Sequence, residues 1–435
     1  MERTDLLIEN CLIVPMNGEP TLKNGVIAVK NGRISFVGDG STSPRIEAEK
    51  RIDAKGQAAL PGLINCHTHV PMTLFRGIAE DKPLHDWLEK TIWPLEAKLK
   101  PEDIYIGALL GCLEMIKSGT TCFSDMYFEE RMVASAVEES GIRADLAEGI
   151  IEAGDPEQGR KMLQKNITFL QEFEGYGDGR ITMRLGPHSA YSCSSQLLSE
   201  ILEKASELNV GIHIHLAESK EMSRKLEQEC GSTEVEFLDD KDLFRRRVLA
   251  AHSIDLSPQD MSVLARRGVD VAYVPVANMK LGLNVARIDH LLGLGVNVGL
   301  GTDGPASNNT LDMFETMKIA ALLQKQSYSD PTVLPSQKVV QMATIDGARA
   351  LGLEKDIGSL QVGKKADIIL VDLFKPHLKP LHDIYANIVY SMQGGDVTTV
   401  IIDGKVVMEN REVKTINERA VMEKAEKTAW DLVSR

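Results

Sequence analysis

The middle of the chain alternates between short apolar runs and stretches with helical spacing. Between residues 60 and 355, eight runs have the length and apolar content of buried strands. They are residues 62–66, 120–124, 143–149, 181–186, 210–216, 248–251, 269–274 and 296–300. Helical patterns between them include residues 101–117, 194–208, 258–266 and 312–324. Eight strands that alternate with helices predict an α/β fold of the TIM (β/α)8 barrel type.

The two ends of the chain show short β-like runs and tight turns instead. These runs are residues 6–14, 25–30, 33–37, 57–60, 368–371, 397–402 and 405–408. Asn31-Gly32 and Asp403-Gly404 each join two runs and are typical of two-residue hairpin turns. Neither end has enough strands for a stable core of its own. We therefore expect residues 1–59 and 356–435 to form one small β-sandwich beside a barrel of residues 60–355.

Composition and charge narrow the possible partners and location. The 435 residues are 43% hydrophobic, and the formal net charge of −14 gives no general attraction for nucleic acid or anionic membranes. No apolar run approaches the roughly 20 residues that span a bilayer, and the N-terminus lacks a signal-peptide pattern. The six cysteines have no disulfide or metal spacing, so buried free thiols are expected. We expect a cytoplasmic homo-oligomer without nucleic-acid or membrane partners.

Polar residues gather where the predicted strands end. Such residues follow or close the first, fourth, fifth, sixth and eighth runs. They are His67, His69, His188, His215, Glu218, His252 and Asp303. In TIM barrels the chemistry takes place at the carboxyl ends of the strands. We therefore expect these side chains to meet at one mouth of the barrel.

His67 and His69 form an H-x-H pair. On extended backbone, residues two apart point to the same side, so both imidazoles can reach one ion at about 2.0–2.1 Å. Alone, the pair fits two hydrogen-bonded barrel histidines equally well. His215 and Asp303 add a third nitrogen and an oxygen, which favours a catalytic metal centre. Residues 185–188 lack the lysine that bridges two ions in binuclear barrel hydrolases, so we expect one divalent ion, Zn²⁺ before Fe²⁺ or Mn²⁺.

Two further residues, Glu218 and His252, can take part in the reaction beside this centre. Glu218, three residues beyond His215, is expected above the metal, where a dry pocket can keep a carboxyl protonated and ready to act as an acid. His252 either binds the metal or hydrogen-bonds its water. Asp303 can take a proton from that water. His213 is interpreted as a packed core histidine or a support for the ligands.

Residues 60–77, LPGLINCHTHVPMTLFRG, strongly resemble the nucleobase-deaminase and chlorohydrolase branch of the amidohydrolase superfamily. Residues 85–88 and 93–96 resemble it too, as do residues 358–367 before the C-terminal strands. The resemblance covers nearly the full chain. It is strongest to the group of methylthioadenosine/S-adenosylhomocysteine deaminases and 5′-deoxyadenosine deaminases.

That resemblance implies catalytic and substrate-binding roles for individual residues. Glu96 matches the glutamate that binds the ribose hydroxyls, Trp87 an aromatic lining residue, and His188 a histidine near the purine. Glu218 matches the acid that protonates N1 of the ring. His252 and Asp303 match the pair that orients and deprotonates the attacking water.

Two positions bear on the 5′ end of the substrate. Arg160 lies near the place where some members have an arginine for the homocysteine carboxylate, although a solvated arginine fits equally well. Glu148 stands in place of a second arginine. This departure argues against S-adenosylhomocysteine as the preferred substrate and leaves methylthio or plain deoxy groups open.

The activity implied is hydrolytic deamination of adenine in 5′-deoxyadenosine, 5′-methylthioadenosine, S-adenosylhomocysteine or adenosine. Hydroxide generated at the metal would attack C6 and release ammonia and an inosine analogue. One alternative is an amino- or chlorohydrolase of guanine, cytosine or an s-triazine, none of which has a ribose for Glu96. Another is a non-catalytic barrel scaffold, which would need no metal.

Overall fold

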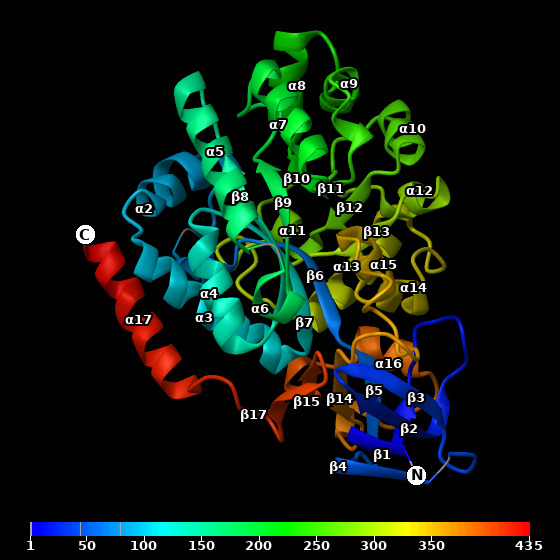
Figure 1. The fold of residues 1–435 in the computed structure, drawn as a ribbon. Helices are drawn as coiled ribbons and strands as arrows, with labels where there is room; N and C mark the ends of the chain where they lie inside the picture. Colours follow the sequence, from blue (N-terminus) through cyan, green and yellow to red (C-terminus); the bar gives the residue numbers. More distant parts are fainter. Residues whose placement is uncertain (1, 44, 79, 174) are drawn as a thin grey trace.

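The computed structural model describes residues 2–43, 45–78, 80–173 and 175–435 (Figure 1). Within them, one sheet has eight strands in the order β13-β12-β11-β10-β9-β8-β7-β6, and the paired neighbours are parallel. The strands are β6 (Leu63–Thr68), β7 (Thr120–Tyr127), β8 (Arg143–Ile150), β9 (Ile181–Pro187), β10 (Gly211–Leu216), β11 (Val248–His252), β12 (Asp270–Tyr273) and β13 (Val298–Leu300). Each overlaps one of the eight predicted runs. The predicted barrel is therefore confirmed.

The barrel closes where the first strand meets the last. β6 and β13 are in contact. Just beyond β13, the amide of Asp303 donates to the carbonyl oxygen of His67 at 2.9 Å. The amide of Thr302 donates to Oδ1 of Asn65 at 3.0 Å. Closure thus places the residue after the eighth strand beside the end of the first.

Helices pack around the barrel (Figure 1). The four predicted helices correspond to α3 (Pro101–Ser118), α7 (Ser195–Glu207), α10 (Pro258–Arg267) and α13 (Met313–Tyr328). Other helices between or after the strands are α4 (Glu130–Ser140), α5 (Pro156–Phe173), α6 (Tyr176–Gly179), α8 (Lys220–Cys230), α9 (Glu234–Asp240), α11 (Pro275–Lys280), α12 (Ile288–Gly293), α14 (Ser336–Met342) and α15 (Ile345–Leu351). α3 has Pro101 in its first turn and ends at Gly119 with a φ of 90°. These are favoured start and stop signals.

The ends of the chain form a second sheet, in which the described residues contribute nine strands. Its order is β17-β16-β15-β14-β5-β1-β2-β3, and β4 pairs with β1. The strands are β1 (Glu2–Ile13), β2 (Leu22–Lys30), β3 (Arg33–Asp39), β4 (Ile46–Asp53), β5 (Gln57–Pro61), β14 (Ile368–Asp372), β15 (Val397–Ile402), β16 (Lys405–Glu409) and β17 (Glu412–Val413). The two ends are joined by β14 pairing with β5. In Figure 1 the blue N-terminal strands accordingly lie beside the orange ones.

The two predicted hairpin turns are present and pack against each other. Asn31, Gly32, Asp403 and Gly404 all have positive φ, as the two-residue hairpin requires. A Cβ on Gly404 would lie 2.6 Å from Cα of Gly32, so glycine is needed at this contact. The composite β-element is therefore confirmed as one hydrogen-bonded sheet. Its predicted boundaries at 59/60 and 355/356 stay a prediction, and β5 spans the first of them.

Several features of the terminal segments were not predicted. β4 alternates charged and apolar residues and hides its strand character, and β17 is only two residues long. α16 (Ile384–Tyr390) and α17 (Glu418–Ser434) add helices to a segment expected to be only β. α17 lies along α3 because Val421, Ala425 and Leu432 are buried at helical spacing (Figure 1). The cysteines are free and buried except Cys230, which is exposed at the end of α8, so the prediction is wrong there.

Membrane insertion through a helix has no support in the described part of the chain. No helix there is both long and apolar enough to cross a bilayer.

Candidate active site

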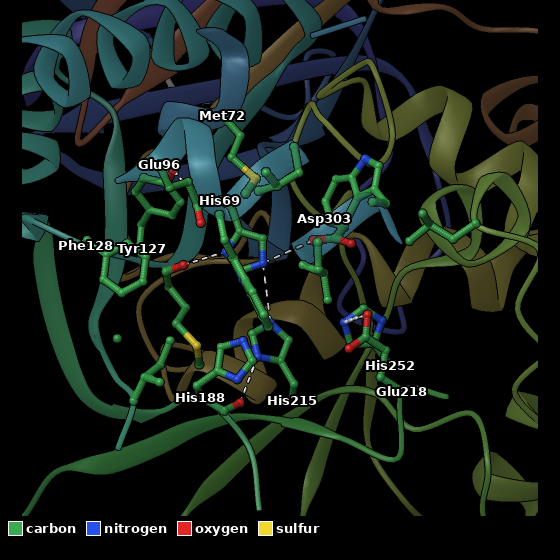
Figure 2. Close-up of a pocket in the computed structure, with 18 of the residues that line it drawn as sticks. His69, Met72, Glu96, Tyr127, Phe128, His188, His215, Glu218, His252 and Asp303 are labelled. Atoms are coloured by element: carbon green, nitrogen blue, oxygen red, sulfur yellow. Dashed lines mark hydrogen bonds and ion pairs between the residues drawn. The ribbon is translucent and has the colours of Figure 1, made fainter. Parts of the chain in front are cut away.

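The predicted polar residues meet at one mouth of the barrel, around a cavity of about 710 Å³ (Figure 2). His67 lies in β6 and His69 directly follows that strand. His215 lies in β10, His252 ends β11, and Asp303 follows β13. All five come from the carboxyl ends of barrel strands, as expected.

The candidate ligands converge on one point in two overlapping groups of three, whose ligand atoms lie within 4.8 Å of one another: His67 with His69 and Asp303, and His67 with His215 and His252. Asp303 Oδ1 lies 3.3 Å from His69 Nε2 and 3.6 Å from His67 Nε2. His69 Nε2 lies 3.4 Å from His215 Nε2. Two ligands held at about 2.1 Å from one tetrahedral ion are separated by about 3.4 Å. The observed distances therefore fit ligands that share a single cation.

The imidazoles are oriented so that their Nε2 atoms face this point. Nδ1 of His69 donates to the carbonyl oxygen of Met126 at 2.5 Å, and Nδ1 of His215 donates to that of His188 at 2.8 Å. A proton on Nδ1 leaves a lone pair on Nε2 for a metal. His67 Nε2 is fully buried and has no hydrogen-bond partner. Because an unpaired buried polar atom is costly, this nitrogen fits the role of a metal ligand.

Burial also keeps the imidazoles of His67 and His215 neutral. It lowers the pKa of His67 and of His215 well below the ordinary value, and the neighbouring imidazoles lower it further. A neutral imidazole is the form that ligates metal. The donor set of three imidazoles and one carboxylate suits zinc and related divalent ions.

Left-handed backbone conformations position several residues of the site. Asp303 has a φ of 62°, His252 of 71° and Ala217 of 47°. Such left-handed conformations cost about 1–3 kcal/mol in residues other than glycine and tend to cluster at functional sites. The Ala217 amide donates to Oε2 of Glu234 at 2.9 Å, which holds the turn between His215 and Glu218.

Glu218 and His252 face each other beside the candidate metal centre. His252 Nε2 lies 3.8 Å from Glu218 Oε1. His252 Nδ1 donates to Oδ1 of Asn278 at 3.1 Å, so Nε2 keeps its lone pair. Burial raises the pKa of Glu218 and favours the protonated carboxyl. The sequence patterns did not indicate Asn278, although it lies in α11, just past the seventh strand.

Glu96 lies in a different part of the cavity wall, in α2 (Trp93–Glu96). Tyr127 Oη donates to Glu96 Oε1 at 2.7 Å (Figure 2). Burial raises the pKa of Glu96 to about 7, and the Tyr127 hydrogen bond partly offsets this. Tyr127 was not predicted because the second strand was expected to end at 124. The observed strand continues to Tyr127 and brings it to the mouth.

Most of the remaining wall is apolar. Trp87 lines it from α1 (Leu84–Trp87). His188 lines it too, and burial lowers the pKa of His188 to about 4, so the imidazole is neutral. The other apolar lining residues are Met72, Leu88, Ile92, Trp93, Met126, Phe128, Ile151 and Leu281. No lysine or arginine is found among the described residues of this wall.

The structure does not bring Arg160 into the cavity. This residue lies on α5, its side chain is 52% exposed, and its Nε is 3.3 Å from Glu200 Oε1. Glu148 is buried behind the wall, where it accepts from the Glu130 amide at 2.8 Å and from Lys165 Nζ at 2.7 Å. The predicted contact between Arg160 and the substrate therefore has no support in this arrangement.

Comparison with known proteins identifies the family of the chain. Residues 58–407 match the amidohydrolase family, and the chain belongs to that family. It is 48% identical to a 5-methylthioadenosine/S-adenosylhomocysteine deaminase of Desulforudis audaxviator, over 98% of this chain and 99% of the relative. It is 46% identical to a 5′-deoxyadenosine deaminase of Methanosarcina acetivorans, over 99% of each chain. A zinc-bound adenosine deaminase of Xanthomonas campestris superposes with a TM-score of 0.96 at 32% identity, over 100% of both chains.

The convergence of ligands predicts metal-dependent stability. After chelator treatment, Zn²⁺ at about 100 times its Kd should raise the Tm by roughly 3 °C, because the ion binds the folded site and not the unfolded chain. Differential scanning calorimetry measures this shift. Asp303→Asn should reduce it, whereas the exposed Asp178→Asn should not. A wild-type Tm that does not change when Zn²⁺ is added would contradict the metal site.

Proposed function

We propose that this protein hydrolytically deaminates the adenine ring of 5′-substituted adenosines to the inosine analogue and ammonia. The candidate substrates are 5′-deoxyadenosine, 5′-methylthioadenosine, adenosine and S-adenosylhomocysteine. One observation carries the proposal: a carboxyl with a raised pKa, Glu218, lies beside the candidate metal ligands, and Glu96 lines the same cavity. The names of the two relatives and of the zinc-bound structure support the same reaction.

We infer that His67, His69, His215 and Asp303 hold one divalent ion. Zn²⁺ is the first choice because the donor set suits it and the Xanthomonas structure contains it, with Fe²⁺ and Mn²⁺ as the other candidates. When bound, such an ion lowers the pKa of a water molecule to about 7 and makes it a nucleophile.

Glu218 acts as the acid. Adenine is a poor electrophile at C6, and a proton on N1 draws electrons away from that carbon. Because its pKa is raised, the Glu218 carboxyl holds its proton to a higher pH than an ordinary glutamate and can pass it to N1. His252 and Asp303 orient the attacking water and take its two protons, and His252 Nε2 lies on the side of Glu218 because Nδ1 is engaged with Asn278. One of these protons goes to the amino group, which leaves as ammonia, and the other restores the Glu218 carboxyl.

Glu96 holds the sugar. Its carboxylate accepts hydrogen bonds from the ribose hydroxyls, and Tyr127 fixes its orientation. Trp87 and His188 line the space for the nucleoside. We propose a preference for uncharged 5′ groups, because the wall offers apolar side chains and no cation among its described residues. A buried carboxylate without a cation is strongly disfavoured.

Assembly and location stay predictions. We propose a homo-oligomer in the cytoplasm that binds a small nucleoside and has no nucleic-acid partner. The net charge of −14 supports the last point.

A substrate series tests the function and the 5′ preference together. We expect kcat/KM for 5′-deoxyadenosine and 5′-methylthioadenosine to exceed that for S-adenosylhomocysteine by about tenfold or more, which corresponds to about 1.4 kcal/mol in transition-state binding. Ammonia release measures all four substrates on one scale. Arg160→Ala should leave the ranking unchanged. A ranking led by S-adenosylhomocysteine would contradict the preference, and no deamination of any adenosine would contradict the function.

Glu218→Gln tests the acid. The amide keeps the shape of the side chain but cannot deliver the proton to N1, so kcat should fall by about 10²–10⁴-fold. Metal content, measured by atomic emission, should stay at the wild-type level. Glu221→Gln, on the exposed start of α8, is the matched control and should retain full activity. Full activity in Glu218→Gln would exclude this role.

Glu96→Ala tests the ribose contact. We expect kcat/KM for adenosine to fall by about 10²-fold, the result of removing hydrogen bonds between a carboxylate and the hydroxyls. Turnover of free adenine should change little, because it has no ribose. Glu102→Ala, exposed on α3, is the control. Equal losses on adenosine and adenine would instead favour a hydrolase of free bases or s-triazines.

A further inference from the structure

A relay of hydrogen bonds, formed by His67, His213, Ser124 and Asp145, leads from Nδ1 of His67 into the barrel interior. His67 Nδ1 lies 2.9 Å from His213 Nε2, and His213 Nδ1 lies 3.3 Å from Ser124 Oγ. Ser124 Oγ donates to Asp145 Oδ2 at 3.3 Å. All four side chains are buried. His213, Ser124 and Asp145 do not line the substrate cavity, so the reaction proposed above does not use them directly.

Asp145, at the far end of this relay, determines which atom donates in every hydrogen bond of the relay. Asp145 accepts from Arg184 Nε at 2.5 Å and from Thr182 Oγ1 at 2.9 Å. A carboxylate paired with a guanidinium is ionised and can only accept. The Ser124 hydroxyl therefore gives its hydrogen to Asp145. Its oxygen is left to accept a hydrogen bond from His213.

That acceptor decides which nitrogen of His213 carries the proton. His213 is fully buried, and its ring faces the imidazole of His67 on one side and the hydroxyl of Ser124 on the other. Because the Ser124 oxygen can only accept from the ring, His213 Nδ1 carries a hydrogen and points it toward Ser124. The single hydrogen between the two rings then lies on His67 Nδ1, since Nε2 of His67 faces the other ligands, and His213 Nε2 accepts it.

His67 differs in this respect from the other two imidazole ligands. His69 and His215 donate their Nδ1 hydrogens to backbone carbonyl oxygens. His67 lies deeper, is 0% exposed, and finds its acceptor on a side chain instead. The nitrogen left with a lone pair is Nε2, which is also the buried atom without a partner.

We propose that His213, Ser124 and Asp145 are positioning residues that hold His67 in the tautomer whose Nε2 binds the metal. The proposal rests on the metal site of the proposed function but not on the identity of the substrate. Partners that orient ligating histidines typically change metal affinity by about 10–100-fold when they are removed.

The Zn²⁺ affinity of the full-length protein tests this relay without any substrate. Chelator-treated protein is titrated with Zn²⁺ against a chromophoric chelator. His213→Phe keeps a buried ring but removes the acceptor, and we expect it to raise the Kd for Zn²⁺ by about 10–100-fold. His213→Gln restores an acceptor oxygen and a donor, and its Kd should lie within about threefold of wild type. This rescue separates the relay from a simple loss of packing.

A matched control removes another buried barrel hydrogen bond. Tyr273→Phe deletes the hydroxyl that accepts from Gln324 Nε2 at 3.1 Å and should leave the Kd for Zn²⁺ unchanged. Ser124→Ala is the milder variant for the case that His213→Phe does not fold, and it should weaken Zn²⁺ binding by up to about tenfold.

Wild-type Zn²⁺ affinity in His213→Phe, or in Ser124→Ala when the former does not fold, would overturn the proposal. So would a His213→Gln variant as weak as His213→Phe. The expected Zn²⁺ pattern in a protein that deaminates no adenosine would support the relay and contradict only the proposed function.

Discussion

Closure of the barrel is the constraint on which the rest of the structure depends. The candidate ligands lie far apart in the chain, and only the ring of parallel strands brings them close together. The hydrogen bond from the Asp303 amide to the His67 carbonyl joins the first and last strands at the level of the site. Because the strands are parallel, all their carboxyl ends open on the same mouth. Ligands, acid and substrate wall therefore share one cavity.

Burial in that mouth acts in opposite directions on bases and acids. It lowers the pKa of His67 and His215, which keeps them neutral and able to bind a cation. It raises the pKa of Glu218, which favours the protonated carboxyl, and raises the pKa of Glu96 to about 7, where the Tyr127 hydrogen bond supports the carboxylate. Both shifts have the same cause, since a site of low polarity disfavours whichever form is charged. One environment thus favours both neutral imidazoles that can bind a metal and a protonated carboxyl that can act as an acid.

The imidazole ligands also show how a barrel specifies a tautomer. Near the rim, backbone carbonyls at the strand ends accept the Nδ1 hydrogens of His69 and His215. Inside the barrel, strand carbonyls are already used in the sheet, so His67 needs a side-chain acceptor. His213 meets this need because it lies two residues before His215 on the same strand and faces the same interior. The pattern of alternate histidines in β10 therefore has two distinct uses.

Much of the protein was predictable from local pattern. Eight apolar runs with helices between them indicated the barrel, and the H-x-H pair with its downstream partners indicated the ligand positions. These features depend on periodicity and on spacing within one strand, which the amino-acid order contains. The charged strand β4, the short β17 and the helix α17 were missed because their stability comes from the neighbours on which they pack.

Contacts between distant segments were decided only by the tertiary structure. Tyr127 meets Glu96, Asn278 meets His252, and Arg160 turns to Glu200 instead of the cavity. A sequence shows which residue types are present, but these pairings depend on how loops from different strands fold over the mouth. The tautomer of His67 depends in the same way on Ser124 and Asp145, which are near it only because the barrel is closed.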